Sequence, residues 1–229
     1  ERTVTGIIQH SGAFAEEIAV AAGTLHEIPH SVGPLTATLA EPLAAALQTF
    51  IMSPITREET IVVLGPGRLG ILIVFIAALK GLKVLAVSRS EAKRDRALDY
   101  GAIWTCSPDE AEVLIRKNTE GLGADLVVDT TGNPDGITQA LKLVRPRGTV
   151  CCKTTCGLPP TGLDMTSLVV DEVRLQGSRC GPFEPALEIL KTHHDKLKHL
   201  ITSTRPLEET QAALESASKE NKVVISMQI

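Results

Sequence analysis

The stretch Ile61-Val62-Val63-Leu64-Gly65-Pro66-Gly67-Arg68-Leu69-Gly70 decides the fold. A short aliphatic run leads into a GxGxxG pattern, and an apolar segment with helical spacing follows. In dinucleotide-binding folds the first glycine permits a tight turn, the second lets the backbone approach a pyrophosphate, and the third lets helix and strand pack closely. An ordinary glycine-rich turn is the alternative, but the position between a strand and a helix favours a phosphate loop. The predicted loop residues are Gly65, Pro66, Gly67, Arg68, Leu69 and Gly70.

From residue 60 onward, short aliphatic runs alternate with helical patterns. The predicted strands are Ile61–Leu64, Lys83–Val87, Leu126–Asp129 and Thr149–Lys153. The predicted helices are Leu69–Lys80, Glu91–Tyr100, Asp109–Lys117 and Asp135–Leu143. Strands rich in Val, Ile and Leu, with polar neighbours only at their ends, are typical of a parallel sheet covered on both faces. We therefore predict an α/β fold, a doubly wound parallel sheet of the Rossmann type.

The end of the second predicted strand bears on the choice of cofactor. In such folds an acidic residue there accepts hydrogen bonds from the ribose hydroxyls of NAD. Here the position holds Ser88, followed by Arg89. A serine does not repel a 2′-phosphate, and a guanidinium can pair with it in bidentate fashion. We expect NADP, with NAD as the alternative if Arg89 is only solvated.

Small polar residues follow the strand Leu126–Asp129, where a doubly wound sheet places its ligand crevice. Thr130, Thr131 and Gly132 would let a cofactor cross the strand edge, and we expect them to meet its nicotinamide half. An ordinary strand-to-helix turn, capped by Thr131 or Asp135, would have the same sequence.

Composition excludes several classes of partner. The formal net charge is −4, so there is no basic excess to neutralise nucleic-acid phosphates. The longest apolar run, Ile71–Leu79, is far short of the roughly 20 residues of a membrane-spanning helix. The apolar residues 18–22 have no basic leader, so we expect a cytoplasmic protein without a membrane partner. Five cysteines without a CxxC pair indicate reduced thiols, and Cys151 and Cys152 would point to opposite faces of a strand.

The two ends of the chain differ from its middle. Near the start lie a strand pattern at Val4–Ile8 and a turn-rich stretch from His26 to Pro34. Near the end, Pro185–Lys191, Leu207–Ser218 and Lys222–Met227 indicate helix, helix and strand. We assign residues 51–182 to the nucleotide-binding domain, and residues 1–50 and 183–229 to a second, incomplete domain made from both ends.

These segments together resemble the zinc-type medium-chain dehydrogenases, a family that includes alcohol, sorbitol and threonine dehydrogenases. Gly12-Ala13-Phe14-Ala15-Glu16 resembles the segment that closes the family's GroES-like catalytic domain, and Glu41-Pro42-Leu43-Ala44-Ala45-Ala46-Leu47 resembles the helix before its nucleotide domain. The glycine pattern follows at family spacing. The return of the chain to the catalytic domain is matched by Gly177-Ser178-Arg179, Pro206-Leu207-Glu208-Glu209 and Lys222-Val223-Val224.

The resemblance implies hydride transfer between NAD(P) and an alcohol, polyol or carbonyl, with a catalytic Zn²⁺ as Lewis acid. It also implies a homodimer or tetramer. The family's first cysteine ligand, its Gly-His-Glu segment and its four-cysteine loop are absent from these residues. A catalytic zinc needs three protein ligands, so we expect a fragment that binds the dinucleotide without turning over substrate.

The resemblance assigns roles to two further residues. Glu41 matches the carboxylate that sorbitol and threonine dehydrogenases place at the catalytic zinc, and its alternative is a helix-start acid favoured by the helix dipole. Lys222 matches a basic position that reaches the cofactor pyrophosphate, and its alternative is a solvated lysine at a strand edge. His193 and His194 are expected at the surface without a chemical role.

Two other functions remain open from the sequence. The chain could be a dinucleotide-binding module without catalysis, such as a sensor. It could also resemble a zinc-free quinone reductase, although Glu41 and its EPL segment argue against that enzyme.

Overall fold

The computed structural model describes residues 3–154, 156–160 and 162–227. The chain divides into two compact units, residues 41–186 and residues 1–40 together with 187–229. This division places residues 41–50 with the sheet, whereas the sequence had placed them with the first segment.

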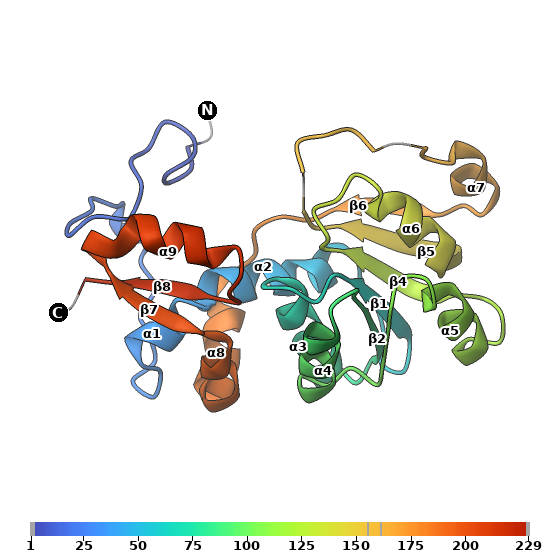
Figure 1. Ribbon diagram of the computed structural model, residues 1–229, viewed down its shortest axis with the longest axis horizontal. Helices are drawn as coiled ribbons and strands as arrows, with labels where there is room; N and C mark the ends of the chain where they lie inside the picture. Colours follow the sequence, from blue (N-terminus) through green and yellow to red (C-terminus); the bar gives the residue numbers. More distant parts are fainter. Residues whose placement is uncertain (1–2, 155, 161, 228–229) are drawn as a thin grey trace. The chain divides into compact units, whose positions relative to one another are not determined.

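The larger unit contains a parallel six-stranded sheet with the order β3-β2-β1-β4-β5-β6 (Figure 1). Its strands are β1 Thr60–Leu64, β2 Lys83–Val87, β3 Trp104–Cys106, β4 Ala124–Asp129, β5 Val144–Cys152 and β6 Arg174–Gly177. Its helices are α2 Ala40–Met52, α3 Gly70–Leu79, α4 Glu91–Asp99, α5 Ala111–Asn118, α6 Gly136–Leu143, α7 Met165–Val170 and the start of α8 Phe183–Leu197. The strand order reverses between β1 and β4, so the predicted doubly wound fold is confirmed.

Both faces of this sheet are buried. Val62 and Leu64 of β1 pack in one cluster with Ile115 of α5 and Leu143 of α6. The alternate β1 residues are equally buried but belong to the opposite face, because successive strand side chains point in opposite directions. Eight of the ten α3 residues are buried as well, which explains why that apolar run lacks a polar face.

One predicted strand was too short, and the three-residue strand β3 was missed. Strand β5 begins at Val144 rather than Thr149. The Arg-Pro-Arg-Gly segment inside it reads as a turn, and Arg147 indeed takes a positive φ of 60° where the pairing with β4 is irregular. Strand β3 has only three residues, too few to show a pattern.

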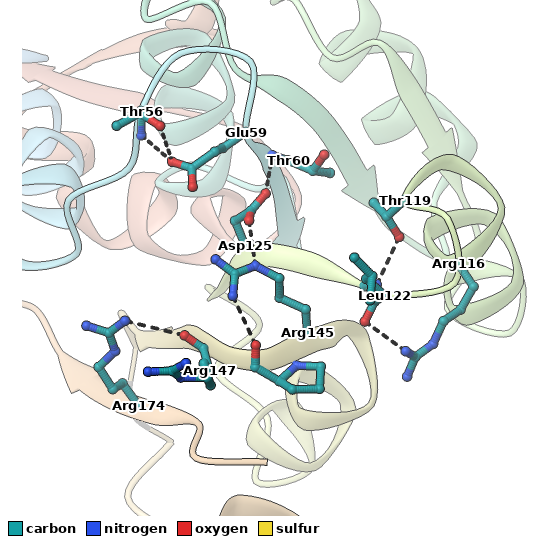
Figure 2. Close-up of polar contacts among 12 residues, drawn as sticks. Thr56, Glu59, Thr60, Arg116, Thr119, Leu122, Asp125, Arg145, Arg147 and Arg174 are labelled. Carbon is teal, nitrogen blue, oxygen red and sulfur yellow. Dashed lines mark hydrogen bonds and ion pairs between the residues drawn. The ribbon is translucent and has the colours of Figure 1, made fainter.

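Charged side chains tie the amino ends of three strands together (Figure 2). The Asp125 carboxylate on β4 accepts a hydrogen bond from the Thr60 backbone N–H of β1 at 2.8 Å. Its other oxygen lies 2.6 Å from Nε of Arg145 on β5. Both side chains are largely shielded, with exposed fractions of 32% for Arg145 and 23% for Asp125. This pair therefore stabilises the sheet at the edge opposite the ligand crevice.

The smaller unit has little regular structure before residue 34. It contains η1 Ala22–Thr24, α1 Pro34–Ala37, most of α8, η2 Lys198–Leu200, β7 Ser203–Pro206, η3 Leu207–Glu209, α9 Thr210–Ala217 and β8 Val223–Ser226. Strands β7 and β8 form a parallel pair. The predicted terminal strand is β8, while β7 was missed because its sequence Ser-Thr-Arg-Pro has no apolar alternation.

Two sequence expectations in this unit are corrected. The predicted strand Val4–Ile8 is wrong, because these two residues close a tight turn through an isolated bridge and Ile7 is exposed. Helix α8 extends to Leu197 rather than ending near Lys191, and its backbone leaves helical geometry at His193.

The segment Pro34–Met52 is long and apolar enough, by length and composition alone, to cross a membrane. Nearly half of its most apolar window (44%) is buried within the structure. Leu43, Ala44 and Ala46 are almost fully covered, as expected for the core helix of a globular unit, which passes the same length and hydropathy criteria.

Candidate dinucleotide site

The loop after β1 has the geometry that its glycines predict. Gly65 has a φ of 80°, which side chains rarely adopt, and a Cβ there would lie 3.2 Å from Cα of Thr131. At Gly70 a Cβ would lie 2.7 Å from Oγ1 of Thr130 and would collide with the carbonyl oxygen of Gly65. Both glycines therefore allow close packing of loop, helix and neighbouring strand.

Gly67 differs from these two positions because its Cβ would meet no atom nearer than 3.9 Å. No side chain of the described residues fills the space above it, and the backbone is open to an approaching ligand. The α3 helix starts three residues later, so its N-terminal partial positive charge favours an anion at this place.

A cavity of about 580 Å³ opens over this loop at the carboxyl ends of β1, β2 and β4. Its lining residues are Leu64, Gly65, Gly67, Val87, Ser88, Arg89, Ser90, Lys93, Pro108, Asp109, Thr130, Thr131, Asn133, Asp135 and Gln139. Six of the residues that the sequence singled out thus share one cavity: Gly65, Gly67, Ser88, Arg89, Thr130 and Thr131. Pro66, Arg68, Leu69, Gly70 and Gly132 belong to the same loops but do not line it.

Basic residues gather at the end of β2. Arg89 and Lys93 both line the cavity and both are exposed to solvent. The Arg94 guanidinium on α4 donates to the carbonyl oxygen of Ser88 at 2.7 Å and to that of Arg89 at 3.3 Å, which braces the turn. Sequence reasoning missed Lys93 and Arg94, although their spacing of four and five residues from Arg89 already places them on the first turn of the next helix.

The threonines after β4 line the cavity and also make hydrogen bonds that hold neighbouring segments in place. Thr130 donates its hydroxyl to the carbonyl oxygens of Leu64 and Gly65, at 2.8 and 2.6 Å, and so holds the glycine loop against β4. Thr131 donates both its N–H and its hydroxyl to the buried Asp129 carboxylate, at 2.9 and 2.7 Å. Contact between these threonines and a nicotinamide remains a prediction.

A buried lysine that the sequence did not single out follows β5. Lys153 is 8% exposed, and its amine donates to Oγ of Ser178 at 2.9 Å and to the carbonyl oxygen of Arg179 at 2.7 Å. Burial lowers the pKa of this amine, against the opposing influence of Cys151, Cys180 and Glu41. The sequence signal was a lysine at the end of the predicted strand Thr149–Lys153.

The cysteines are free thiols rather than disulfides. Cys152 packs against the core cluster of α5 and α6, whereas Cys151 lies beside Lys153, so the two neighbours occupy opposite faces as predicted. Burial raises the pKa of Cys106 and of Cys152 to about 11. Neither thiol is a thiolate near neutral pH.

The described residues alone do not supply a zinc site. Glu41 lies exposed in the first turn of α2, and no group of three or more His, Cys, Asp or Glu side chains within residues 3–154, 156–160 and 162–227 could hold a metal ion. Lys222 belongs to the smaller unit, where its amine donates to the carbonyl oxygen of Thr38 at 3.4 Å. The roles that the resemblance assigns to both residues remain predictions.

Comparison with known families decides the relationship. The sequence profile described as "Zinc-binding dehydrogenase" matches residues 69–192, more than half of the chain. The chain belongs to this family. It is 26% identical to a sorbitol dehydrogenase from Halalkalibacterium halodurans over 90% of its own length and 62% of the relative's. It is 32% identical to an L-threonine 3-dehydrogenase from Pyrococcus abyssi over 71% of its length and 47% of the relative's.

A solved structure agrees with the fold. A zinc-binding dehydrogenase from Sinorhizobium meliloti 1021, bound to NADP, superposes with a TM-score of 0.83 at 27% identity. The match covers 95% of this chain and 67% of that one. The chain spans about three fifths of the sorbitol dehydrogenase and about half of the threonine dehydrogenase that it matches.

Proposed function

We propose that the chain is the cofactor-binding part of an NAD(P)-dependent dehydrogenase that transfers hydride between the nicotinamide and an alcohol, polyol or carbonyl substrate. The observation that carries this proposal is the open backbone at Gly67, below a cavity at the point where the strand order reverses. Membership of the zinc-binding dehydrogenase family supports it. The sorbitol and threonine dehydrogenases among the relatives favour a small polar alcohol as substrate.

The cofactor that the cavity favours is NADP. No carboxylate follows β2 at the place where NAD-binding folds hold the ribose, and the residues there are Ser88, Arg89 and Ser90. Lys93 adds a second cation to the same wall. Asp109 also lines the cavity, and its negative charge would repel the 2′-phosphate of NADP. The preference for NADP over NAD should therefore be moderate.

Zinc, when bound, would polarise the substrate oxygen as a Lewis acid. It needs three protein ligands and one open position, and Glu41 is the single ligand that the resemblance assigns within this chain. We expect the chain on its own to bind the dinucleotide without turnover.

We also propose a homodimer or higher oligomer built on the edge of the sheet. Strand β6 is an edge strand, and Leu175 on it and Val169 and Val170 on α7 are exposed apolar side chains. An open edge of this kind is commonly covered by a second copy.

The deciding experiment is a titration of NADPH by fluorescence against the wild type, Gly67→Val and Gly23→Val. A side chain at residue 67 occupies the space that the pyrophosphate needs, so this variant should lose binding while its circular dichroism is unchanged. Gly23 has no atom within 4 Å of its Cβ position and lies far from the loop in sequence, so it controls for the substitution itself. Wild-type affinity in Gly67→Val would show that the loop is not the phosphate site.

A further inference from the structure

Lys153 stands out because it is a buried cation held only by neutral groups. Its two hydrogen-bond acceptors are a hydroxyl and a backbone carbonyl. No carboxylate oxygen of the described residues lies within 4.0 Å of its amine. An ammonium that is removed from water without a counter-charge is costly, so such groups are rare unless they serve a site.

Three titratable groups influence this amine from the elements around it. Cys151 lies on β5, Cys180 follows β6, and Glu41 lies on α2. The Cys151 thiol is neutral near pH 7 because burial raises its pKa, and Glu41 is exposed, so solvent screens its charge. The positive charge of Lys153 is therefore only weakly compensated from within the chain.

The backbone of Lys153 lies beside the turn after β4, which we expect to meet the nicotinamide. The backbone N–H of Lys153 donates to the carbonyl oxygen of Asp129 at 3.0 Å, and the hydroxyl of Thr154 accepts from the N–H of Gly132 at 2.9 Å. The end of β5 is thus joined on both sides of Lys153 to the turn after β4, and neighbouring strands are only about 4.8 Å apart. In a doubly wound sheet this edge is the ligand crevice.

We propose that Lys153 makes the site bind the reduced cofactor more tightly than the oxidised one. The oxidised nicotinamide ring carries a positive charge, and the ring becomes neutral when it accepts hydride. A nearby unpaired ammonium therefore repels only the oxidised form. Unit charges about 10 Å apart, at an effective dielectric constant of about 20, give a difference of roughly tenfold in affinity. This inference rests on the proposed function, since it requires a nicotinamide cofactor in the crevice.

The effect also has a redox consequence. When a site binds the reduced form of a cofactor about tenfold more tightly than the oxidised form, the two-electron reduction potential of the bound cofactor rises by about 30 mV. A lysine that only tethers residues 178 and 179 would stabilise the fold without discriminating between the two forms of the cofactor.

Calorimetric titration with NADP⁺ and NADPH separates these roles. The variants are Lys153→Gln, which keeps N–H donors for Arg179 without the charge, and Lys153→Arg, which keeps the charge. Lys117→Met is the matched control, because it removes one positive charge from an exposed position on α5. We expect a ratio of dissociation constants near ten in the wild type, Lys153→Arg and the control, and a ratio near one in Lys153→Gln, mainly through tighter binding of NADP⁺.

Three results would overturn the inference: equal affinities for the two forms in the wild type, an unchanged ratio in folded Lys153→Gln, or an equal loss of the ratio in Lys153→Arg and Lys153→Gln. If Lys153→Gln does not fold, the ratio of dissociation constants in the wild type and in Lys153→Met, which also lacks the charge, tests the inference in the same way. A wild type that binds neither form would instead refute the proposed function.

Discussion

The choice between NADP and NAD gives the sharpest test of the adenosine end of the cavity. We expect the wild type to bind NADPH about tenfold more tightly than NADH. A charge-assisted hydrogen bond contributes roughly 1.5–3 kcal/mol, and each 1.4 kcal/mol is about a factor of ten in affinity. Arg89 is exposed, and Asp109, which lines the same cavity, repels the phosphate, so the low end of this range applies.

The variants follow from the same geometry. Arg89→Ala should remove most of the preference with little loss of NADH affinity, and Lys93 should maintain the remainder. Ser88→Asp should reverse the order, because a carboxylate there accepts bonds from the free ribose hydroxyls and repels a 2′-phosphate. Raising the salt concentration should weaken NADPH binding more than NADH binding. Fluorescence titration of both reduced cofactors measures this, and equal or tighter NADH binding by the wild type refutes the assignment.

Four further results are expected. Asp125→Ala should lower the free energy of unfolding by about 2–3 kcal/mol in a urea titration, because it leaves Arg145 and the Thr60 N–H without their shared acceptor; a change below about 0.5 kcal/mol would contradict this. Iodoacetamide at pH 8 should modify the exposed Cys180 well before Cys106, whose raised pKa of about 11 keeps the thiol neutral; peptide mass mapping that finds equal rates would refute the assignment. The dialysed 229-residue chain should retain less than one zinc ion by elemental analysis, and a tightly held stoichiometric ion would show that its ligands have been misjudged. Light scattering should find a dimer or larger species that Leu175→Glu converts to monomer, and a monomeric wild type would defeat the proposed edge interface.

Local signals in the sequence were sufficient for the glycine loop. The roles of Gly65, Gly67 and Gly70 depend on backbone conformation and on the element that follows directly, so a short window contains the necessary information. The long buried strands were predicted for the same reason, because their apolar runs are continuous. Strands β3 and β7 were missed because they have three and four residues and owe their existence to a neighbouring strand.

Long-range contacts explain what the sequence did not reveal at the site. The buried amine of Lys153 donates hydrogen bonds to Ser178 and Arg179, which lie 25 and 26 residues later in the chain. The threonines after β4 were expected to face a cofactor, yet Thr130 also holds the glycine loop 65 residues earlier. A strand end predicts polar chemistry, but only the folded neighbours determine which atoms are already engaged.

Charges at the two edges of the sheet have different partners. We therefore expect the charges at the amino edge to affect stability and those at the carboxyl edge to affect cofactor binding. At the amino edge, Arg145 is matched by a carboxylate at 2.6 Å, so the pair compensates itself and leaves little field for a ligand. At the carboxyl edge, Arg89 lines an open cavity and Lys153 donates only to neutral groups. The chain carries a net charge of −4, so a general excess of basic residues does not explain these cations. Loss of the Asp125 pair should therefore destabilise the sheet without altering the preference between cofactors, whereas substitutions at Arg89 or Lys153 should alter cofactor preference in a chain that remains folded.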